Sequence, residues 1–429
     1  MLSSLQFLLI GDIHYPRNKD ESFGDIKDTL QSTLTRSQLG NTKLMALRKC
    51  LMERMNETEY DSILVTGDLS EKGSSSGYVE GVEYLLKSLE SITGTVLEEV
   101  LHVVPGNHDI QRLVEPTNVE QAKKKFDIII DTWTSKRLSV ATVDKMRARS
   151  YSNKDGCRVD VISLNSCVGC GELRELHPET KRIVLDYISK AGSGLSDADK
   201  GKLLHETLDT PMFWQEDRAG IATTINNLPN DSLPIILAHH NLLPQTTPRT
   251  PATELLDGGH MRLQLHEPKR SVIYCHGHTH EHSIEAVVSE LSWPWKTILI
   301  GCPELTEGFN EIVVQYSRKK YPIGCIVNRY RSTGKVKYEF HSSVRIPLLE
   351  MSNYKERIDP AIFKLTQLLD NKPRRFSQIK VLIEDDTMFS GYSDEELASL
   401  FLEAEWFGIL EIRNREDRFE DWQLEKLTP

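Results

Sequence analysis

Leu101-His102-Val103-Val104-Pro105-Gly106-Asn107-His108-Asp109 is the stretch from which the fold is predicted. Its apolar start is typical of a buried strand, and Pro105-Gly106 ends that strand in a turn. An amide, an imidazole and a carboxylate follow directly, and all three side chains can contact a metal ion or a phosphate. The stretch therefore predicts a strand that ends in a functional site.

Four other apolar runs also end in a loop that carries aspartate or histidine. Because the carboxyl ends of neighbouring strands meet at one edge of an α/β sheet, we expect all five loops to meet in one pocket. The four runs and their loops are residues 7–10 before Gly11-Asp12-Ile13-His14, 63–66 before Gly67-Asp68, 234–238 before His239-His240, and 272–275 before Gly277-His278-Thr279-His280.

The residues between these loops predict alternating strands and helices. Apolar side chains at helical spacing mark helices, and residues 159–164 form a further apolar run typical of a strand. Such alternation predicts an α/β layered fold. The predicted helices are 44–55, 79–89, 181–190 and 213–225, and the predicted strands of a second sheet, which closes the domain near residue 350, are 295–300, 311–315, 324–329 and 335–341.

The composition limits the class of protein. The chain has 429 residues, a hydrophobic share of 39% and a net charge of -11, so it can form a full core and its overall charge does not favour nucleic acid or an anionic membrane. Its seven cysteines show no regular spacing, which indicates reduced thiols in a cytoplasmic protein, and we interpret Cys167-x-x-Cys170 as buried or incidental thiols. No apolar run approaches the roughly 20 residues of a membrane helix, and the apolar start is too short for a signal peptide.

Residues 111–150 combine helical spacing with an excess of basic side chains. We interpret this segment as a helical cap beside the pocket, where it would attract an anionic substrate. The alternative is a set of solvated helix faces. Its basic residues are Arg112, Lys123, Lys124, Lys125, Lys136, Arg137, Lys145, Arg147 and Arg149, and its acidic residues are Glu115, Glu120, Asp127, Asp131 and Asp144.

The chemistry of the five loops indicates a metal centre. Carboxylate, amide and imidazole ligands favour zinc, manganese or iron over a metal that selects thiolates. One ion would leave ligands unused, whereas two ions about 3.5–4 Å apart would use them, with one carboxylate bridging both. Such a pair lowers the pKa of a bound water, so that hydroxide attacks phosphorus near neutral pH. The expected reaction is hydrolysis of a phosphoester.

The five loops, in this order, resemble the five signature blocks of the calcineurin-like metallophosphoesterase family. The resemblance extends over roughly residues 7–345, although the specific matches lie in the blocks alone. The expected fold is a layered α-β-β-α sandwich of two mixed sheets. The matching residues are Asp12-x-His14, Gly67-Asp68, Gly106-Asn107-His108-Asp109, His239, and Gly277-His278-Thr279-His280.

The resemblance also implies a role for each side chain. His108 would face the phosphate and stabilise charge or protonate the leaving oxygen, and Asp109 would orient it. His239 is favoured over its neighbour His240 as a ligand, with His240 behind it or at the substrate. The implied metal ligands are Asp12, His14 and His280 for one ion, Asn107, His239 and His278 for the other, and Asp68 as the bridge.

The loop Gly67-Asp68-Leu69-Ser70-Glu71-Lys72-Gly73 bears on the substrate. It lacks the arginine with which protein phosphatases of this superfamily hold a phosphomonoester. It resembles the loop of cyclic-nucleotide and glycerophosphodiester phosphodiesterases, although Glu71 stands where they have aspartate and Asn241 where they have proline. We therefore expect a phosphodiester, with nucleotides or nucleic acid among the candidates. Two alternatives stay open: a metal-dependent DNA nuclease of the repair-exonuclease type, and a partner-binding protein with a vestigial metal site.

Residues 1–350 form the expected phosphoesterase domain, and residues 351–429 form a small C-terminal domain. Predicted helices at 360–369 and 376–384, a third helix after the capping box Ser393-Asp394-Glu395-Glu396, and strands at 408–413 and 419–424 are typical of a winged-helix module. The third helix would repel DNA, so we expect a protein contact or self-association there, the alternative being a solvated acidic face. Its acidic residues are Asp394, Glu395, Glu396, Glu403 and Glu405.

Overall fold

The computed structural model describes residues 2–15, 43–71, 73, 75–89, 94–111, 123–171, 178–196, 210–244, 255–288, 295–333, 337–348, 358–369, 372–415 and 417–427. Lys72, three charged residues of the predicted cap (Arg112, Glu115 and Glu120), and the predicted domain boundary at residue 350 therefore lie outside the described residues.

Two mixed sheets of six strands each are formed by the described residues of the large domain. The first contains β1 (Ser4–Ile10), β2 (Ser62–Val65), β3 (Leu101–Val103), β10 (Gly308–Tyr316), β11 (Pro322–Ser332) and β12 (Tyr338–Pro347), in the order β12-β11-β10-β1-β2-β3. The second contains β4 (Arg147–Ser152), β5 (Arg158–Ser163), β6 (Ser232–Leu237), β7 (Val272–His280), β8 (Ile284–Val287) and β9 (Thr297–Pro303), in the order β4-β5-β6-β7-β9-β8.

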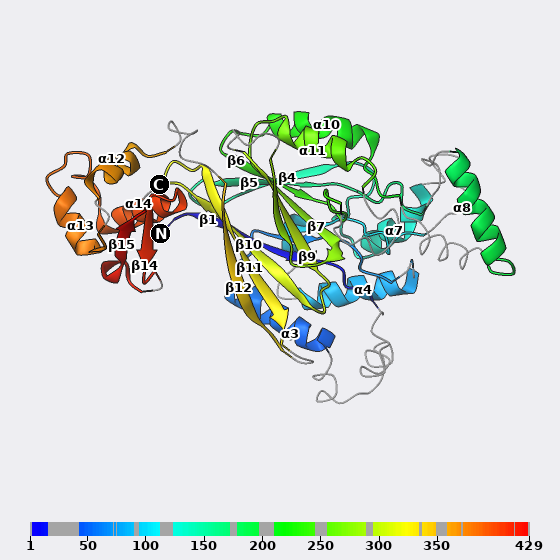
Figure 1. Cartoon of the computed structure of the whole chain (residues 1–429). Helices are drawn as coiled ribbons and strands as arrows, with labels where there is room; N and C mark the ends of the chain where they lie inside the picture. Colours follow the sequence, from blue (N-terminus) through cyan, green and yellow to red (C-terminus); the bar gives the residue numbers. More distant parts are fainter. Residues whose placement is uncertain are drawn as a thin grey trace.

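Helices cover the outer face of each sheet (Figure 1). The first sheet packs against α3 (Lys43–Glu57) and α4 (Ser75–Ser88), and the second against α10 (Gln215–Asn226) and α11 (Gly258–His266). The side chains of β1 alternate between two cores: Phe7 and Leu9 face the second sheet, whereas Leu8 and Ile10 face the helices. The layered α-β-β-α sandwich is thus confirmed.

The last three strands of the large domain join a different sheet from the one expected. Strand β10 pairs antiparallel with β1, with Leu5 opposite Val314, and β11 and β12 continue outward from β10. The meander therefore extends the first sheet, and of its predicted strands β9 alone belongs to the second sheet. The prediction of a separate sheet was wrong because an apolar run shows that a strand is buried but not which open edge it joins.

The segment predicted as a helical cap also contains a strand. Its described part includes a 3-10 turn (Lys124–Phe126) and helix α7 (Asp127–Ser135). Of the four apolar side chains at helical spacing, Phe126, Ile129 and Trp133 are buried, whereas Ile130 is 42% exposed. Residues 147–150 belong to β4, an exposed edge strand paired with β5. No strand was expected there, because an edge strand with solvent on its faces carries no apolar alternation.

A small C-terminal domain with its own core follows the large one, at the orange and red end of the molecule in Figure 1. Ser393 Oγ accepts the Glu396 N–H at 3.3 Å and Glu396 Oε2 accepts the Ser393 N–H at 2.8 Å, which is the predicted capping box. The second predicted strand is displaced, because residues 419–421 form a 3-10 turn before it. The elements are α12 (Pro360–Leu368), β13 (Arg374–Arg375), α13 (Phe376–Ile383), α14 (Asp394–Trp406), β14 (Leu410–Arg413) and β15 (Gln423–Lys426).

Helix α14 joins this domain to the first sheet. Trp406 packs against Ile323 of β11, and the Arg345 guanidinium lies 4.2 Å from the centroid of the Trp406 ring. Arg345 Nη1 also donates to Glu405 Oε2 at 2.8 Å. The acidic helix is therefore held by the sheet of its own chain. Among the helices described, none combines the length and apolar character that crossing a bilayer requires.

Candidate metal centre

The loops after β1, β2, β3 and β6 meet the carboxyl end of β7 between the two sheets. Four side chains form the first group: Asp12, His14, Asp68 and His280 place their ligand atoms within 4.8 Å of one another. His14 Nε2 is 3.0 Å from His280 Nε2, and Asp12 Oδ1 is 3.4 Å from His280 Nε2. Two imidazole nitrogens and two carboxylates that face one another in this way need a shared positive charge.

A second group adjoins the first and shares Asp68. Its centre is His239 Nε2, which lies 3.0 Å from Asn107 Oδ1 and 3.4 Å from Asp68 Oδ2. His239 Nδ1 donates to the Thr66 carbonyl at 2.8 Å, which leaves Nε2 as the nitrogen that faces the two oxygens. The ring of His278 lies 5.2 Å from that of His239, centroid to centroid. The structure thus brings together all seven side chains that the sequence suggested as ligands.

The backbone that presents these side chains is strained. Such conformations cost about 1–3 kcal/mol each and cluster at functional sites. Two glycines allow the loops to approach: a Cβ on Gly106 would lie 2.0 Å from Asp68 Oδ1, and one on Gly277 would lie 2.3 Å from Asp12 Oδ2. The residues with positive φ are Asp12 (51°), His14 (48°), Asp68 (51°), His278 (65°) and His280 (57°).

Burial and charge act in opposite directions on the site. Burial would raise the pKa of Asp68, but His239 and His108 hold that pKa well below its ordinary value. Burial would lower the pKa of His239, yet Asp68 raises it well above its ordinary value, while burial of His14 lowers its pKa to about 3. The site therefore attracts positive charge, and its oxygen and nitrogen ligands fit borderline divalent cations. The residues present are compatible with the expected metal pair.

His108 and Asp109 adjoin the first group. The half-buried His108 ring lies 4.8 Å from the His14 ring, centroid to centroid, and the His108 N–H donates to Asp68 Oδ1 at 2.8 Å. Asp109 is buried, which raises its pKa to about 7, and its two oxygens accept the N–H groups of Ser70 and Gly106 at 2.8 and 2.9 Å. Asp109 thereby holds the loop after β3, which carries His108, against the loop after β2, which carries Asp68.

His240 lies behind His239. It is fully buried, and its Nδ1 is 2.9 Å from Ser166 Oγ. Ser166 Oγ also accepts the N–H groups of His239 and His240 at 3.2 and 3.1 Å. The ring of His240 also lies 4.5 Å from that of His278, centroid to centroid, so its position at the ligand or at the substrate stays a prediction.

Two acidic residues near the site were not predicted as functional. Glu71 Oε2 is 4.0 Å from His14 Nδ1, and Glu304 Oε2 is 3.9 Å from His280 Nδ1. These distances are too long for hydrogen bonds, so the carboxylates act on the two rings through their charge. Glu304 directly follows β9, so the strand-end pattern that predicted the other loops also applies to it.

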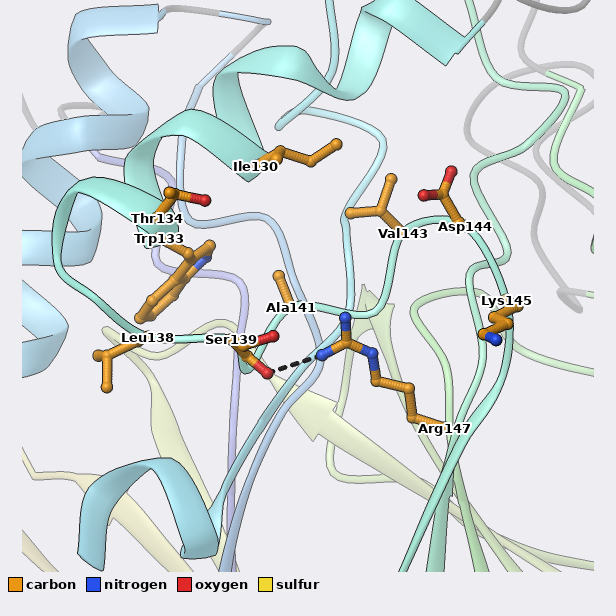
Figure 2. A pocket seen from close by; sticks show the side chains of 10 residues that line it. All are labelled: Ile130, Trp133, Thr134, Leu138, Ser139, Ala141, Val143, Asp144, Lys145 and Arg147. Carbon is orange, nitrogen blue, oxygen red and sulfur yellow. Dashed lines mark hydrogen bonds between the residues drawn. The ribbon is translucent and has the colours of Figure 1, made fainter. Parts of the chain in front are cut away.

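The described cap contains a cavity of 240 Å³ that is separate from the five loops (Figure 2). Within this cavity, Arg147 Nη1 donates to the Ser139 carbonyl at 2.7 Å. Elsewhere in the cap, Lys136 Nζ pairs with Glu83 Oε1 at 2.9 Å, and Arg149 donates to the carbonyls of Glu98 and Glu99. These cations bind neighbouring protein groups. The cavity is lined by Ile130, Trp133, Thr134, Leu138, Ser139, Ala141, Val143, Asp144, Lys145 and Arg147.

Comparison with known proteins supports the family resemblance. A family model for calcineurin-like phosphoesterases matches residues 5–282, and a search of curated proteins found no match. A 5'-nucleotidase precursor from Thermus thermophilus is 12% identical with a TM-score of 0.37, and the match covers 81% of this chain and 54% of that one. The calcineurin-like phosphoesterase YfkN from Bacillus subtilis is 12% identical with a TM-score of 0.35, covering 81% and 91%. Haemophilus influenzae NAD nucleotidase is 9% identical with a TM-score of 0.36, covering 82% and 57%. These scores are too low to indicate a substrate.

Proposed function

The chain belongs to the calcineurin-like phosphoesterase family, and on that premise we propose that it hydrolyses a phosphoester with two divalent cations. The observation that carries the proposal is that carboxylates and imidazoles from distant loops, all buried except the partly exposed His280, place their ligand atoms within 4.8 Å of one another. When bound, zinc, manganese or iron ions would make water nucleophilic at neutral pH and neutralise charge at phosphorus. The residues that would hold them are Asp12, His14 and His280, then Asn107, His239 and His278, with Asp68 between the two.

His108 would act on the substrate. Its backbone is fixed by the hydrogen bond to Asp68, and its ring is partly exposed beside the first group. A ring N–H of His108 would donate to the phosphate and protonate the leaving oxygen. Asp109 would position it indirectly, by holding the loop.

We further propose that the substrate is a phosphodiester. In the loop after β2, Ser70 is buried and its hydroxyl donates to the His108 carbonyl at 2.8 Å, while Glu71 lies behind His14. These two positions therefore support the ligand loops, in a segment that has no arginine to hold a phosphomonoester. Lys72, which follows them, lies outside the described residues.

A DNA nuclease is less well supported. The nuclease alternative was based on the basic side chains of the cap. Three of them, Lys136, Arg147 and Arg149, bind protein groups close to them. A cytoplasmic location also belongs to the proposal, supported by seven free cysteines.

The test is a hydrolysis screen of the full chain loaded with manganese, zinc or ferrous iron. Substrates are bis(p-nitrophenyl) phosphate, p-nitrophenyl phosphate, cyclic nucleotides, nucleoside monophosphates and linear DNA. We expect diesters to be cleaved faster than monoesters, activity to be lost on chelation and restored by metal, and DNA to stay intact. Faster monoester cleavage would overturn the diester proposal alone. No turnover with any metal would overturn the enzyme and favour a binding protein.

A further inference from the structure

Cys167, Cys170 and His240 form another cluster of metal-ligating atoms. Their ligand atoms lie within 4.8 Å of one another, and all three residues are fully buried. Cys170 Sγ is 3.9 Å from His240 Nε2. Zinc bonds of about 2.3 Å to sulfur and about 2.0–2.1 Å to nitrogen place tetrahedral ligands about 3.6 Å apart. The observed separation is close to that of two ligands on one ion.

The turn that carries the two cysteines is closed by its own hydrogen bonds. Cys170 N donates to the Cys167 carbonyl at 3.1 Å, and Cys167 N donates to Asn165 Oδ1 at 2.8 Å. Gly169 has no room for a side chain, since a Cβ there would lie 2.1 Å from the Thr210 carbonyl oxygen. The turn therefore fixes both cysteines before any ion binds.

A buried ammonium holds the backbone of the turn. Lys125 is 1% exposed, and its Nζ donates to the carbonyls of Val168 and of Cys170, the latter at 3.0 Å. The Cys167 thiol donates to the Pro105 carbonyl at 3.2 Å, so a bound metal ion would replace the proton of this thiol. Two thiolates would balance the charge of one divalent ion, so a buried cation here would not be left uncompensated.

The orientation of His240 completes the cluster. Its Nδ1 faces Ser166 Oγ at 2.9 Å, and its Nε2 is the nitrogen on the side of Cys170. Ser166 Oγ already accepts two backbone N–H groups, so without a metal its hydroxyl donates to Nδ1 and the Nε2 proton faces Cys170. Binding of an ion requires the other tautomer, with the proton on Nδ1 and the Nε2 lone pair on the ion. Thiolates also separate this cluster chemically from the catalytic groups, which contain oxygen and nitrogen ligands.

We propose that Cys167, Cys170 and His240 bind a third, thiophilic cation of the zinc class. The ion would join the loop after β5 to the loop after β6, and would thereby position His239, the residue next to His240. The site is structural, and it does not depend on the phosphoesterase activity proposed above.

Cobalt spectroscopy tests this site without reference to turnover. Thiolate ligands give Co²⁺ an intense near-ultraviolet charge-transfer absorption, which the sulfur-free catalytic groups cannot produce. We expect reduced full-length protein to develop this absorption up to one equivalent per chain. The double variant Cys167→Ser/Cys170→Ser should lose the absorption and one of three bound ions by elemental analysis. Cys325→Ser, which changes a buried cysteine of β11, should retain both.

Three results would overturn the proposal. They are the absence of a thiolate absorption in the folded wild-type protein, its persistence in the double variant, and a Cys167–Cys170 disulfide in protein purified without air. The spectrum of the wild-type protein alone tests whether thiolates bind the ion, even if the double variant does not fold. His240 also lies near His239 and His278, so His240→Ala is the further check. It should weaken cobalt binding at the thiolates at least tenfold and leave the catalytic pair occupied, and loss of that pair instead would remove His240 from the proposed site.

Discussion

Asp68 is the residue that both groups of candidate ligands share. Its Oδ2 lies 3.4 Å from His239 Nε2 and 3.7 Å from His14 Nε2, while its Oδ1 accepts the His108 N–H. Asp68→Asn keeps the oxygen that His108 needs but removes the negative charge between the two ion positions. We expect metal affinity to fall by more than the ~10–100-fold typical of residues that only support a ligand. Elemental analysis after dialysis measures this, and a full complement of metal in the variant would show that Asp68 is no bridge.

His108 should behave in the opposite way. His108→Ala removes the proposed proton donor and leaves the seven ligands in place, so we expect the variant to keep its metal and lose about 10²–10⁴-fold in kcat. His341→Ala, at an exposed position of β12, is the matched control and should retain activity. A metal-free His108→Ala protein would mean that His108 is a ligand.

Glu71 and Glu304 provide a test of the residues behind the ligands. Each carboxylate lies within 4.0 Å of the Nδ1 atom of a ligand candidate, His14 or His280. We expect Glu71→Gln and Glu304→Gln each to lower metal affinity by up to about 10–100-fold, because a negative charge close to the ligating imidazole is removed. Competition with a fluorescent chelator measures the affinity, with Glu285→Gln on the exposed part of β8 as control. Unchanged affinity in both variants would show that neither carboxylate supports the site.

At the scale of single elements, buried strands were predictable and exposed ones were not. β2 and β6 are buried along their whole length, so their sequences are continuous apolar runs. β4 and β8 lie at the edges of their sheet, have no fully buried side chain and were missed. The place of Glu304 in the site was also not predictable, because it depends on β9 pairing beside β7, where His280 lies opposite Pro303. Local sequence carries little information about which strands pair over long distances.

The loop after β3 depends on a glycine. A Cβ on Gly106 would lie 2.0 Å from Asp68 Oδ1 and 2.1 Å from Asp68 N, so backbone must move. We expect Gly106→Ala to displace Asp68, to weaken metal binding, and to destabilise the protein by about 1–3 kcal/mol. Gly391→Ala is the matched control, since a Cβ there meets no atom within 4 Å. Thermal unfolding and metal analysis of both variants test this, and equal behaviour of the two would contradict the close approach.

At the scale of the whole molecule, a small C-terminal domain of helices and strands was predicted, its winged-helix type stays a prediction, and its contact surface was not foreseen. The acidic residues of the third helix were expected to meet another protein, whereas Glu403 and Glu405 meet Arg318 and Arg345 of the first sheet and the turn beside it. Glu403 accepts the backbone N–H of Arg318, and Glu405 pairs with the Arg345 guanidinium. Sequence alone does not show these contacts, because the partners are more than fifty residues apart. The acidic helix stabilises a contact within the chain, and a contact with another protein stays a prediction.

Glu403 makes this contact dependent on pH. It is fully buried, its Oε2 accepts the Arg318 N–H at 3.1 Å, and burial raises its pKa from 4.5 to about 7 despite the opposing effects of Arg318 and Lys319. The folded protein therefore holds this proton to a higher pH than the unfolded chain does. The contribution to stability is full below pH 4.5, declines as the pH rises to about 7, and is then constant.

Glu403→Gln keeps the amide-accepting oxygen and cannot ionise. We expect it to leave α14 as stable as in the wild type at pH 4.5, and to stabilise it by about 1–3 kcal/mol at pH 8, where the wild type carries a buried charge. Hydrogen exchange of the α14 amides, corrected for intrinsic rates, measures the opening free energy at each pH. Glu395→Gln removes the same charge from an exposed position of the same helix and should not change the pH dependence. If the two variants follow the same curve, the dependence arises from the overall charge of the helix, and the buried carboxyl of Glu403 does not control how the domain docks.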